Sequence, residues 1–227
     1  FATGGEFASA TSFLVEVAPS GKRGFYGSLQ MVGQSLAALG GALSGLLVTQ
    51  SLDPEQIDSW GWRLPFIFGL LIGPVGLYIR KYLDETEVFL EAKSKSENSI
   101  GTSLLMQQAR GLAVTFSLVI CGTISYYIVL VYMPTYAKTQ LAIPLKEAFF
   151  AQFVGLVCLT LVIPICGKLS DRIGRKPIMM AATIAIFCCL YPLFSWVQNE
   201  PGVDRLTIMQ AILCSFIGMY FGTISTA

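Results

Sequence analysis

Hydrophobic residues in this chain run in long stretches that contain no Lys, Arg, Asp or Glu. Six stretches follow one another along the sequence: 24–52, 64–79, 111–137, 148–167, 177–199 and 206–227. Five of them reach the ~20 residues that a helix needs to cross ~30 Å of hydrocarbon. Residues 64–79 are fewer, and Trp60 and Trp62 extend that stretch at the membrane interface. The pattern therefore predicts a series of membrane-spanning helices.

A seventh helix precedes these six. Residues 1–17 are apolar apart from Glu6 and Glu16, and they match the rear part of a span. The sequence opens at Phe1 and stops at Ala227 inside an apolar run, so we expect it to be a piece of a longer protein. A soluble helical core is the alternative, but its helices would be amphipathic, and these are apolar on all sides.

The composition agrees with a lipid environment. Charged residues make up 13% of the chain, against the ~25% usual in soluble domains, and the mean hydropathy is +0.64. The net charge of +1 offers nothing to attract nucleic acid, and we expect no such partner. The six cysteines all lie in apolar runs and the chain has no histidine, so we expect packing cysteines and no metal site.

Basic residues alternate between the connections, and this alternation predicts the orientation. One set of connections holds eleven of them: Lys22, Arg23, Arg80, Lys81, Lys93, Lys95, Arg110, Lys168, Arg172, Arg175 and Lys176. The opposite set holds four: Arg63, Lys138, Lys146 and Arg205. Because cytoplasmic loops are enriched in Lys and Arg, the first set is expected in the cytoplasm. Residues 81–110 form the one long, highly charged connection, which suggests a linker between two groups of helices.

The connection at residues 167–177 has the most specific sequence, GKLSDRIGRKP. Its glycines allow a tight turn and a close approach of helices. Asp171 is an anion that can lie against the N-terminus of a neighbouring helix, where the partial positive charge stabilises it. Such a cluster can lock two helix bundles in one state and release them in another. We therefore assign Gly167, Asp171, Arg172, Gly174, Arg175 and Lys176 to a cytoplasmic gate.

This motif resembles the G-x-x-x-D-R-x-G-R-K signature of the major facilitator superfamily, in the copy between its helices 8 and 9. The resemblance implies an all-α integral membrane protein with the major facilitator fold of two six-helix bundles, here incomplete. Residues 1–80 would then end the N-terminal bundle (helices 4–6), 81–110 would be the cytoplasmic linker, and 111–227 would start the C-terminal bundle (helices 7–10).

Further segments resemble the metabolite:proton symporters of that superfamily, whose members carry citrate, 2-oxoglutarate, shikimate, or proline and betaine. They are FATGGEF at 1–7, EVAP at 16–19, KRGFYGS at 22–28, WGWRLPF at 60–66, LDETEVF at 83–89 and YMPTY at 132–136. The resemblance implies proton-coupled symport of a small organic acid, such as citrate or another carboxylate, across the plasma membrane by alternating access. It implies no cofactor besides the coupling proton, and a monomer when full length.

Glu6 is the one acid well inside a predicted span. A charged carboxylate at mid-bilayer costs about 2.5–3.5 kcal/mol, so Glu6 should face the bundle interior, as a proton-coupling or substrate site. The alternative is a structural partner for a basic residue on another helix. Glu16 lies near the cytoplasmic end, and we expect it to pair with Arg23 or with a neighbouring bundle.

Polar side chains with helical spacing are the candidates for a substrate cavity. Tyr26, Gln30 and Gln34 share one face of a helix, since they are spaced by four. Tyr126, Tyr127 and Gln152 offer hydroxyls and an amide on the spans expected to be helices 7 and 8. Hydrogen bonding between helices is the alternative role for each of these residues.

Three other functions were weighed against organic-acid symport. An enzyme would need a nucleophile beside a base, or metal ligands, at membrane depth, and the sequence suggests neither. A receptor or channel without solute coupling would not respond to an imposed pH gradient. The last is a symporter for a zwitterionic osmolyte such as proline or betaine, because the basic residues lie only at helix ends, whereas a tricarboxylate would require positive charge in its cavity.

Overall fold

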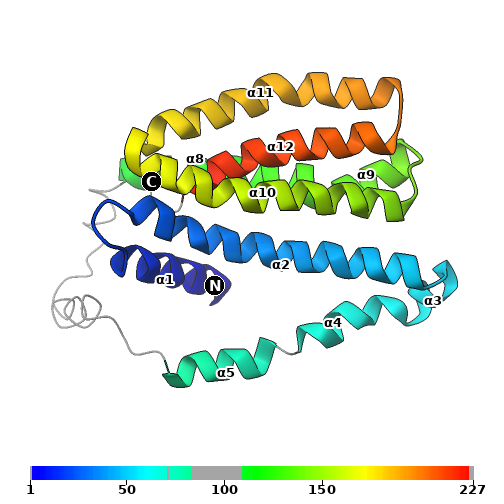
Figure 1. The fold of residues 1–227 in the computed structure, drawn as a ribbon, viewed down its shortest axis with the longest axis horizontal. Coiled ribbons are helices and arrows are strands. Elements are labelled where there is room, and N and C mark those ends of the chain that lie inside the picture. Colours follow the sequence, from blue (N-terminus) through cyan, green and yellow to red (C-terminus); the bar gives the residue numbers. More distant parts are fainter. Residues whose placement is uncertain (1, 71, 83–108, 225–227) are drawn as a thin grey trace.

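The computed structural model describes residues 2–70, 72–82 and 109–224, and within these ranges every regular element is a helix (Figure 1). The elements, in chain order, are α1 (Ala2–Glu16), α2 (Arg23–Ser51), α3 (Pro54–Ser59), the 3-10 helix η1 (Gly61–Arg63), α4 (Leu64–Gly69), α5 (Ile72–Tyr82), α8 (Ala109–Tyr126), the π-helix η3 (Tyr127–Val131), α9 (Met133–Gln140), α10 (Leu145–Ile173), α11 (Arg175–Asn199) and α12 (Val203–Ile224).

Six segments of the described chain are long and apolar enough to cross a membrane. They are Arg23–Ser51, Gly61–Tyr78, Gly111–Val131, Leu145–Ile173, Arg175–Asn199 and Val203–Ile224. These are the six spans predicted from the sequence, and the protein is a multi-pass membrane protein. The seventh predicted helix is present as α1, with 15 residues.

The long helices α2 and α10 form the centre of the arrangement. They run antiparallel along each other, and α10 also packs along its length against α12 (Figure 1). Helix α11 covers α12 on the far side from α2, and α1 lies against α2. Helices α2 and α10 therefore form the main contact between the N-terminal and C-terminal parts of the described chain, and α2 also contacts α12.

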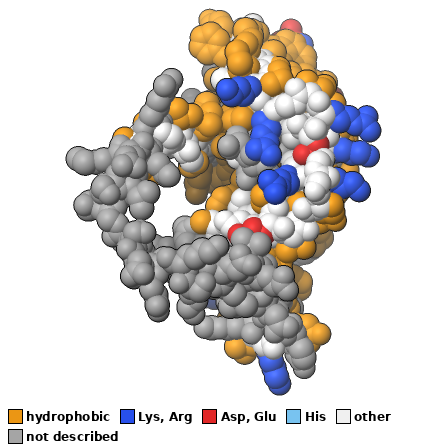
Figure 2. All heavy atoms as spheres, turned by 90° about the vertical axis from the view of Figure 1, so that its left-hand side faces the viewer, with side chains coloured by type: hydrophobic (Ala, Val, Ile, Leu, Met, Phe, Trp, Pro, Cys, Tyr) orange, Lys and Arg blue, Asp and Glu red, His pale blue; other side chains and the backbone are white. Residues whose placement is uncertain are grey.

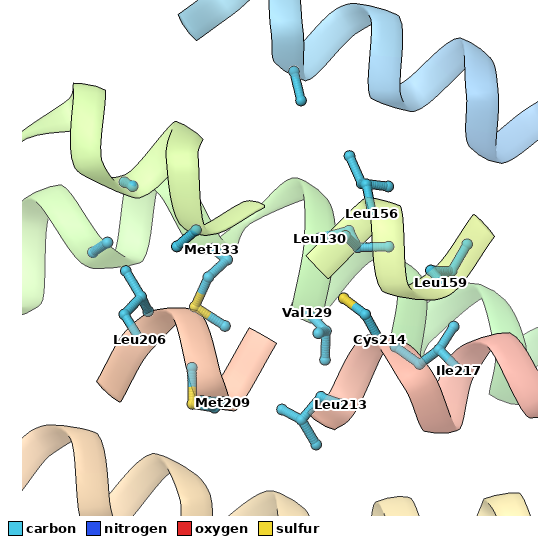
Figure 3. Packing of buried hydrophobic residues seen from close by; sticks show 14 of the residues in the cluster. Val129, Leu130, Met133, Leu156, Leu159, Leu206, Met209, Leu213, Cys214 and Ile217 are labelled. Carbon is cyan, nitrogen blue, oxygen red and sulfur yellow. The ribbon is translucent and has the colours of Figure 1, made fainter. Parts of the chain in front are cut away.

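The most deeply buried side chains lie where η3, α9, α10 and α12 meet. Figure 3 shows Val129, Met133, Leu156, Leu213 and Cys214 of this cluster, each at most 2% exposed. On α11, by contrast, Phe187 is 85% exposed. Because lipid is as apolar as these side chains, close packing between helices must stabilise the cluster, rather than removal of apolar surface from water.

Small residues bring α12 onto α10. A Cβ atom on Gly222 would lie 2.5 Å from the carbonyl oxygen of Ile163, and one on Gly218 would lie 3.0 Å from that of Leu159. Any larger residue would push the two backbones apart. Interhelical contact in lipid depends on such small residues, because they allow the close approach that dispersion forces require.

The basic residues gather at one end of the helices. Lys22 and Arg23 lie where α2 begins, Lys168 and Arg172 in the last turns of α10, and Arg175 where α11 begins. Figure 2 views this end and shows the Lys and Arg side chains around few acids. Lys138, Lys146 and Arg205 lie on elements that meet at the opposite end (Figure 1). The first end is therefore the cytoplasmic one by the positive-inside rule.

Gly222→Ala should lower the stability of the full-length protein by about 1–3 kcal/mol, the usual effect of overpacking. Gly40→Ala is the matched control, because a Cβ at Gly40 meets no atom within 4 Å. The measurement is the midpoint of thermal unfolding in detergent. Equal midpoints for the two variants would show that the α10–α12 contact is not as tight as described.

Candidate functional site

The predicted gate motif forms the end of α10 and the turn into α11. Helix α10 ends at Ile173, and α11 begins at Arg175. Gly174 between them has a φ of 95°, in the left-handed region where a side chain is strained. A turn of one residue is possible here because that residue is glycine. Asp171 is thereby placed on the last turn of α10, close to the cytoplasmic end of α2.

The Asp171 carboxylate binds the N-terminus of α2. The backbone N–H of Gly24 donates to Oδ1 at 2.6 Å, and that of Phe25 donates to Oδ2 at 3.0 Å. The first amides of a helix have no partner within the helix, and Lys22, the N-cap residue of α2, provides no side-chain cap. Asp171 therefore caps α2 from 147 residues away, and we call this contact the latch.

Glycines on both helices make the latch possible. A Cβ on Gly24 would lie 2.6 Å from the Gly167 carbonyl oxygen and 2.7 Å from Asp171 Oδ1. A Cβ on Gly167 would lie 2.6 Å from Ser28 Cβ. Gly167 belongs to the predicted gate motif, whereas no role was predicted for Gly24 or Ser28. Gly24 in the first turn of α2 was a usable signal for this contact. Glycine lowers helix stability, so its presence there suggests that another backbone comes close.

The contact between α2 and α10 continues from the latch into the membrane, and we call it the seam. Ser35 lies seven residues after Ser28 on α2, and Thr160 lies seven residues before Gly167 on α10. The Thr160 hydroxyl donates to Ser35 Oγ at 3.1 Å. Ser35 is 1% exposed. A seven-residue repeat keeps one helix face against its neighbour, so the seam stays in contact over several turns.

A pocket of about 540 Å³ lies between α1, α2, α8 and α12, and we call it the central pocket. Phe7, Met31 and Phe221 are among its apolar lining residues. Its polar groups are mainly hydroxyls, with one amide: Thr11, Ser12, Gln34, Thr115, Thr123, Tyr126 and Tyr127. The described lining contains no Lys, Arg, Asp or Glu. Such a surface can orient a small polar solute through neutral hydrogen bonds and aromatic faces.

The predicted cavity residues divide into two groups. Gln34, Tyr126 and Tyr127 line the central pocket. Tyr26 and Gln30 are absent from its described lining, because each step of four residues turns the helix by about 40° and carries them away from the face of Gln34. Tyr26 borders a pocket at the surface instead. The α10 span was expected to approach the cavity, but it contributes no described lining residue, because it packs between α2 and α12.

Gln152 bonds between helices, which was the alternative role for it. Its Nε2 donates to the Leu130 carbonyl oxygen at 2.8 Å. In an α-helix that carbonyl would accept from residue 134, but Pro134 has no N–H. The chain forms the π-helix η3 at this point, and Gln152 supplies the missing donor. A proline four residues after Leu130 and an amide on the next helix were the signals for this bond.

Two buried side-chain amide atoms have no hydrogen-bond partner among the described residues. They are Oε1 of Gln152 on α10 and Nε2 of Gln210 on α12. Gln210 is fully buried and was not singled out from the sequence, because its neighbours are apolar. An unpaired acceptor and an unpaired donor on adjacent helices can be satisfied together by a water or by a rearrangement.

The remaining predicted residues other than Glu6 lie on the cytoplasmic side. Arg172 and Lys176 are exposed and Arg175 is half-buried, and none forms an ion pair with a described residue. Glu16 ends α1 and Arg23 begins α2, and the described contacts include no ion pair between them. Glu6 lies on α1, but its side chain is outside the described part. Residues 83–108 of the predicted linker also lie outside it.

The Thr and Ser hydroxyls of the central pocket were not predicted, whereas those of Tyr126 and Tyr127 were. Thr115, Val119, Thr123 and Tyr127 are spaced by four and form one face of α8. This polar stripe on an otherwise apolar span was a usable signal. No group of three His, Cys, Asp or Glu side chains in the described ranges comes together as a metal site would require.

Comparison with known proteins relates these features to a family. The family model described as Major Facilitator Superfamily matches residues 1–227. The chain belongs to the Major Facilitator Superfamily. The Asp171 turn, predicted from its resemblance to the signature of this superfamily, is thus part of a chain that matches the family from end to end.

Two kinds of curated relatives from this superfamily are similar to the chain. A citrate-proton symporter of Salmonella typhi is 31% identical over 227 residues, which is 100% of this chain and 52% of the relative. A proline/betaine transporter of Escherichia coli strain K12 is 30% identical over 238 aligned residues, which cover 99% of this chain and 48% of the relative. The chain thus spans about half the length of these relatives. No solved structure matches the chain.

Asp171→Asn should destabilise the full-length protein by about 1–3 kcal/mol, because an amide has one acceptor oxygen and leaves one α2 N–H unpaired. Asp204→Asn is the control, since Asp204 is an exposed acid in the first turn of α12. Thermal unfolding in detergent measures both. If Asp204→Asn lowered the midpoint as much as Asp171→Asn, the latch would have no special stability.

Proposed function

We propose that the full-length protein is a secondary transporter that carries a small carboxylate-bearing solute together with a proton by alternating access. The observation that carries this proposal is the latch: a single carboxylate closes the cytoplasmic end of the seam, and the central pocket lies beside the same helix, α2. A pocket at membrane depth beside a breakable contact is what alternating access requires. The named transport activities of the relatives support the same proposal.

In this proposal the two parts of the chain belong to two bundles, 1–80 and 111–227, joined by the linker at 81–110. The latch favours the state in which α2 and α10 meet at the cytoplasmic end. Opening toward the cytoplasm would separate Asp171 from the amides of Gly24 and Phe25, and water would then solvate both. Arg172, Arg175 and Lys176 are the basic residues of the gate, and they would be free to pair with acids in that step.

Two solute classes fit the proposal. A small organic acid such as citrate was favoured by the sequence resemblance. A zwitterion such as proline or betaine is favoured by the described lining of the central pocket, which offers hydroxyls for a carboxylate and the rings of Phe7, Tyr126 and Phe221 for a cationic nitrogen, but no basic side chain. The relatives transport one or the other class according to their names.

Solute uptake by the purified full-length protein in vesicles tests this function. With an inward proton gradient, we expect accumulation of citrate, proline or betaine that a protonophore abolishes. Asp171→Asn should slow this uptake, and Asp204→Asn should not. If no solute of either class responded to the gradient, the proposal would be wrong. If citrate alone were accumulated, the zwitterion alternative would be excluded.

Glu6 remains the proposed proton-coupling residue, since it is the one acid well inside a predicted span. Glu6→Gln should abolish accumulation driven by the pH gradient, because an amide cannot release a proton, while exchange of labelled for unlabelled solute persists. Glu55→Gln on α3 is the control, as Glu55 is exposed at the opposite end from the latch. Full gradient-driven accumulation by Glu6→Gln would assign the coupling to another residue.

A further inference from the structure

A second pocket, of about 360 Å³, opens at the cytoplasmic end of α2 and α10, and we call it the cytoplasmic pocket. Its volume lies in the ~300–1,000 Å³ range of small-molecule sites. Lys22, Phe25 and Tyr26 contribute from the α2 side, and Lys168, Asp171 and Arg172 from α10. The proposed transport cycle uses the latch that borders this pocket, but it leaves the pocket itself without a role.

The cytoplasmic pocket lies on the opposite flank of the seam from the central pocket. Each residue advances a helix by about 100°. Relative to Ser28 and Ser35, which face α10, Met31 and Gln34 therefore lie on one side of α2, and they line the central pocket. Phe25 and Lys22 lie on the other side, and they line the cytoplasmic pocket. The seam therefore separates the cytoplasmic pocket from the central pocket.

The charges around the cytoplasmic pocket are out of balance. Lys22, Lys168 and Arg172 are exposed, and none has an ion pair or a side-chain hydrogen bond with a described residue. The one acid of the lining, Asp171, already accepts an amide proton at each oxygen. The three cations outnumber this one committed carboxylate, and the space between them would stabilise an anion.

An apolar surface continues from this pocket along the same flank of the seam. On α2 it is formed by Leu29, Leu36 and Leu43, which are 36%, 52% and 41% exposed. On α10 it is formed by Leu161 and Ile165, which are 61% and 64% exposed. These residues follow Phe25 and Lys168 at helical spacing and lead toward the middle of the membrane. A ligand that fits the whole flank has an anionic head and a long apolar tail.

We propose that the cytoplasmic pocket binds the phosphate of an anionic phospholipid from the inner leaflet, with an acyl chain along the apolar flank. The inner leaflet is the side on which anionic lipids meet basic membrane-proximal residues. The phosphate would join Lys22 on one side of the latch to Lys168 and Arg172 on the other. Bound lipid therefore favours the latched state, a consequence that rests on the proposed transport function, whereas the binding does not.

Lipid retention by the purified full-length protein tests the binding. Native mass spectrometry compares phosphatidylglycerol with phosphatidylcholine of the same acyl chains. We expect wild type to prefer phosphatidylglycerol, and the double variant K22Q/K168Q to lose about 10- to 30-fold of that preference, as expected for two lysines near an anionic headgroup. The matched control K138Q/K146Q removes the same charge at the opposite end and should keep the preference.

Two further measurements separate the possible outcomes. Added inorganic phosphate should not displace the lipid, because free phosphate lacks the apolar contacts of the flank; displacement at equal concentration would show a simple anion site. Leu36→Ser should weaken retention of both lipids without changing the preference. Equal loss of preference in K22Q/K168Q and K138Q/K146Q, or no preference in wild type, would overturn the proposal. Uptake assays are not needed for this result, so it stands apart from the proposed transport.

Discussion

The Asp171 carboxylate on the first amides of α2 is the contact on which the cytoplasmic side of this molecule depends. Helix α2 begins at Arg23 without a side-chain cap of its own, so its N-terminal amides require an acceptor from elsewhere. The acceptor comes from α10, at a place where glycines on both helices let the backbones approach. An ion–dipole contact of this kind is strong when water is excluded and weak once water enters. The Asp171 contact can therefore both form, when water is excluded, and break, when water enters.

The rest of the structure makes that contact selective for one geometry. The seam places Ser28 against Gly167 and Ser35 against Thr160, so a shift of α2 along α10 would lose the hydrogen bond at mid-membrane as well as the latch. Helix α12 holds α10 from the other side through Gly218 and Gly222. Small residues bring these helices into close contact. Tightly packed helices of this kind move as rigid bodies more readily than they deform gradually.

Polar groups at membrane depth occur in two settings with different consequences. Gln152 replaces the donor that Pro134 lacks, and it supports the π-helix η3 between α8 and α9. The hydroxyls of Thr115, Thr123 and Tyr127 are left for the central pocket. The Gln152 amide nitrogen is bound to a backbone carbonyl and does not line the pocket, so residue type alone did not reveal its role.

Amino-acid order determined the spans, their orientation and the gate motif, because each depends on local properties. A run of apolar residues such as 148–167 must be buried in lipid wherever it lies, and Lys168 to Lys176 must stay in the cytoplasm whichever helix they meet. Tertiary structure alone decided which amides Asp171 accepts from, that Gln34 and Tyr127 share a pocket, and that Tyr26 and Gln152 do not line it. These relations join residues up to 147 positions apart, and they depend on the rotation of each helix about its axis. In lipid that rotation follows from small-residue contacts such as Gly24 with Gly167, which periodicity on an all-apolar helix does not encode.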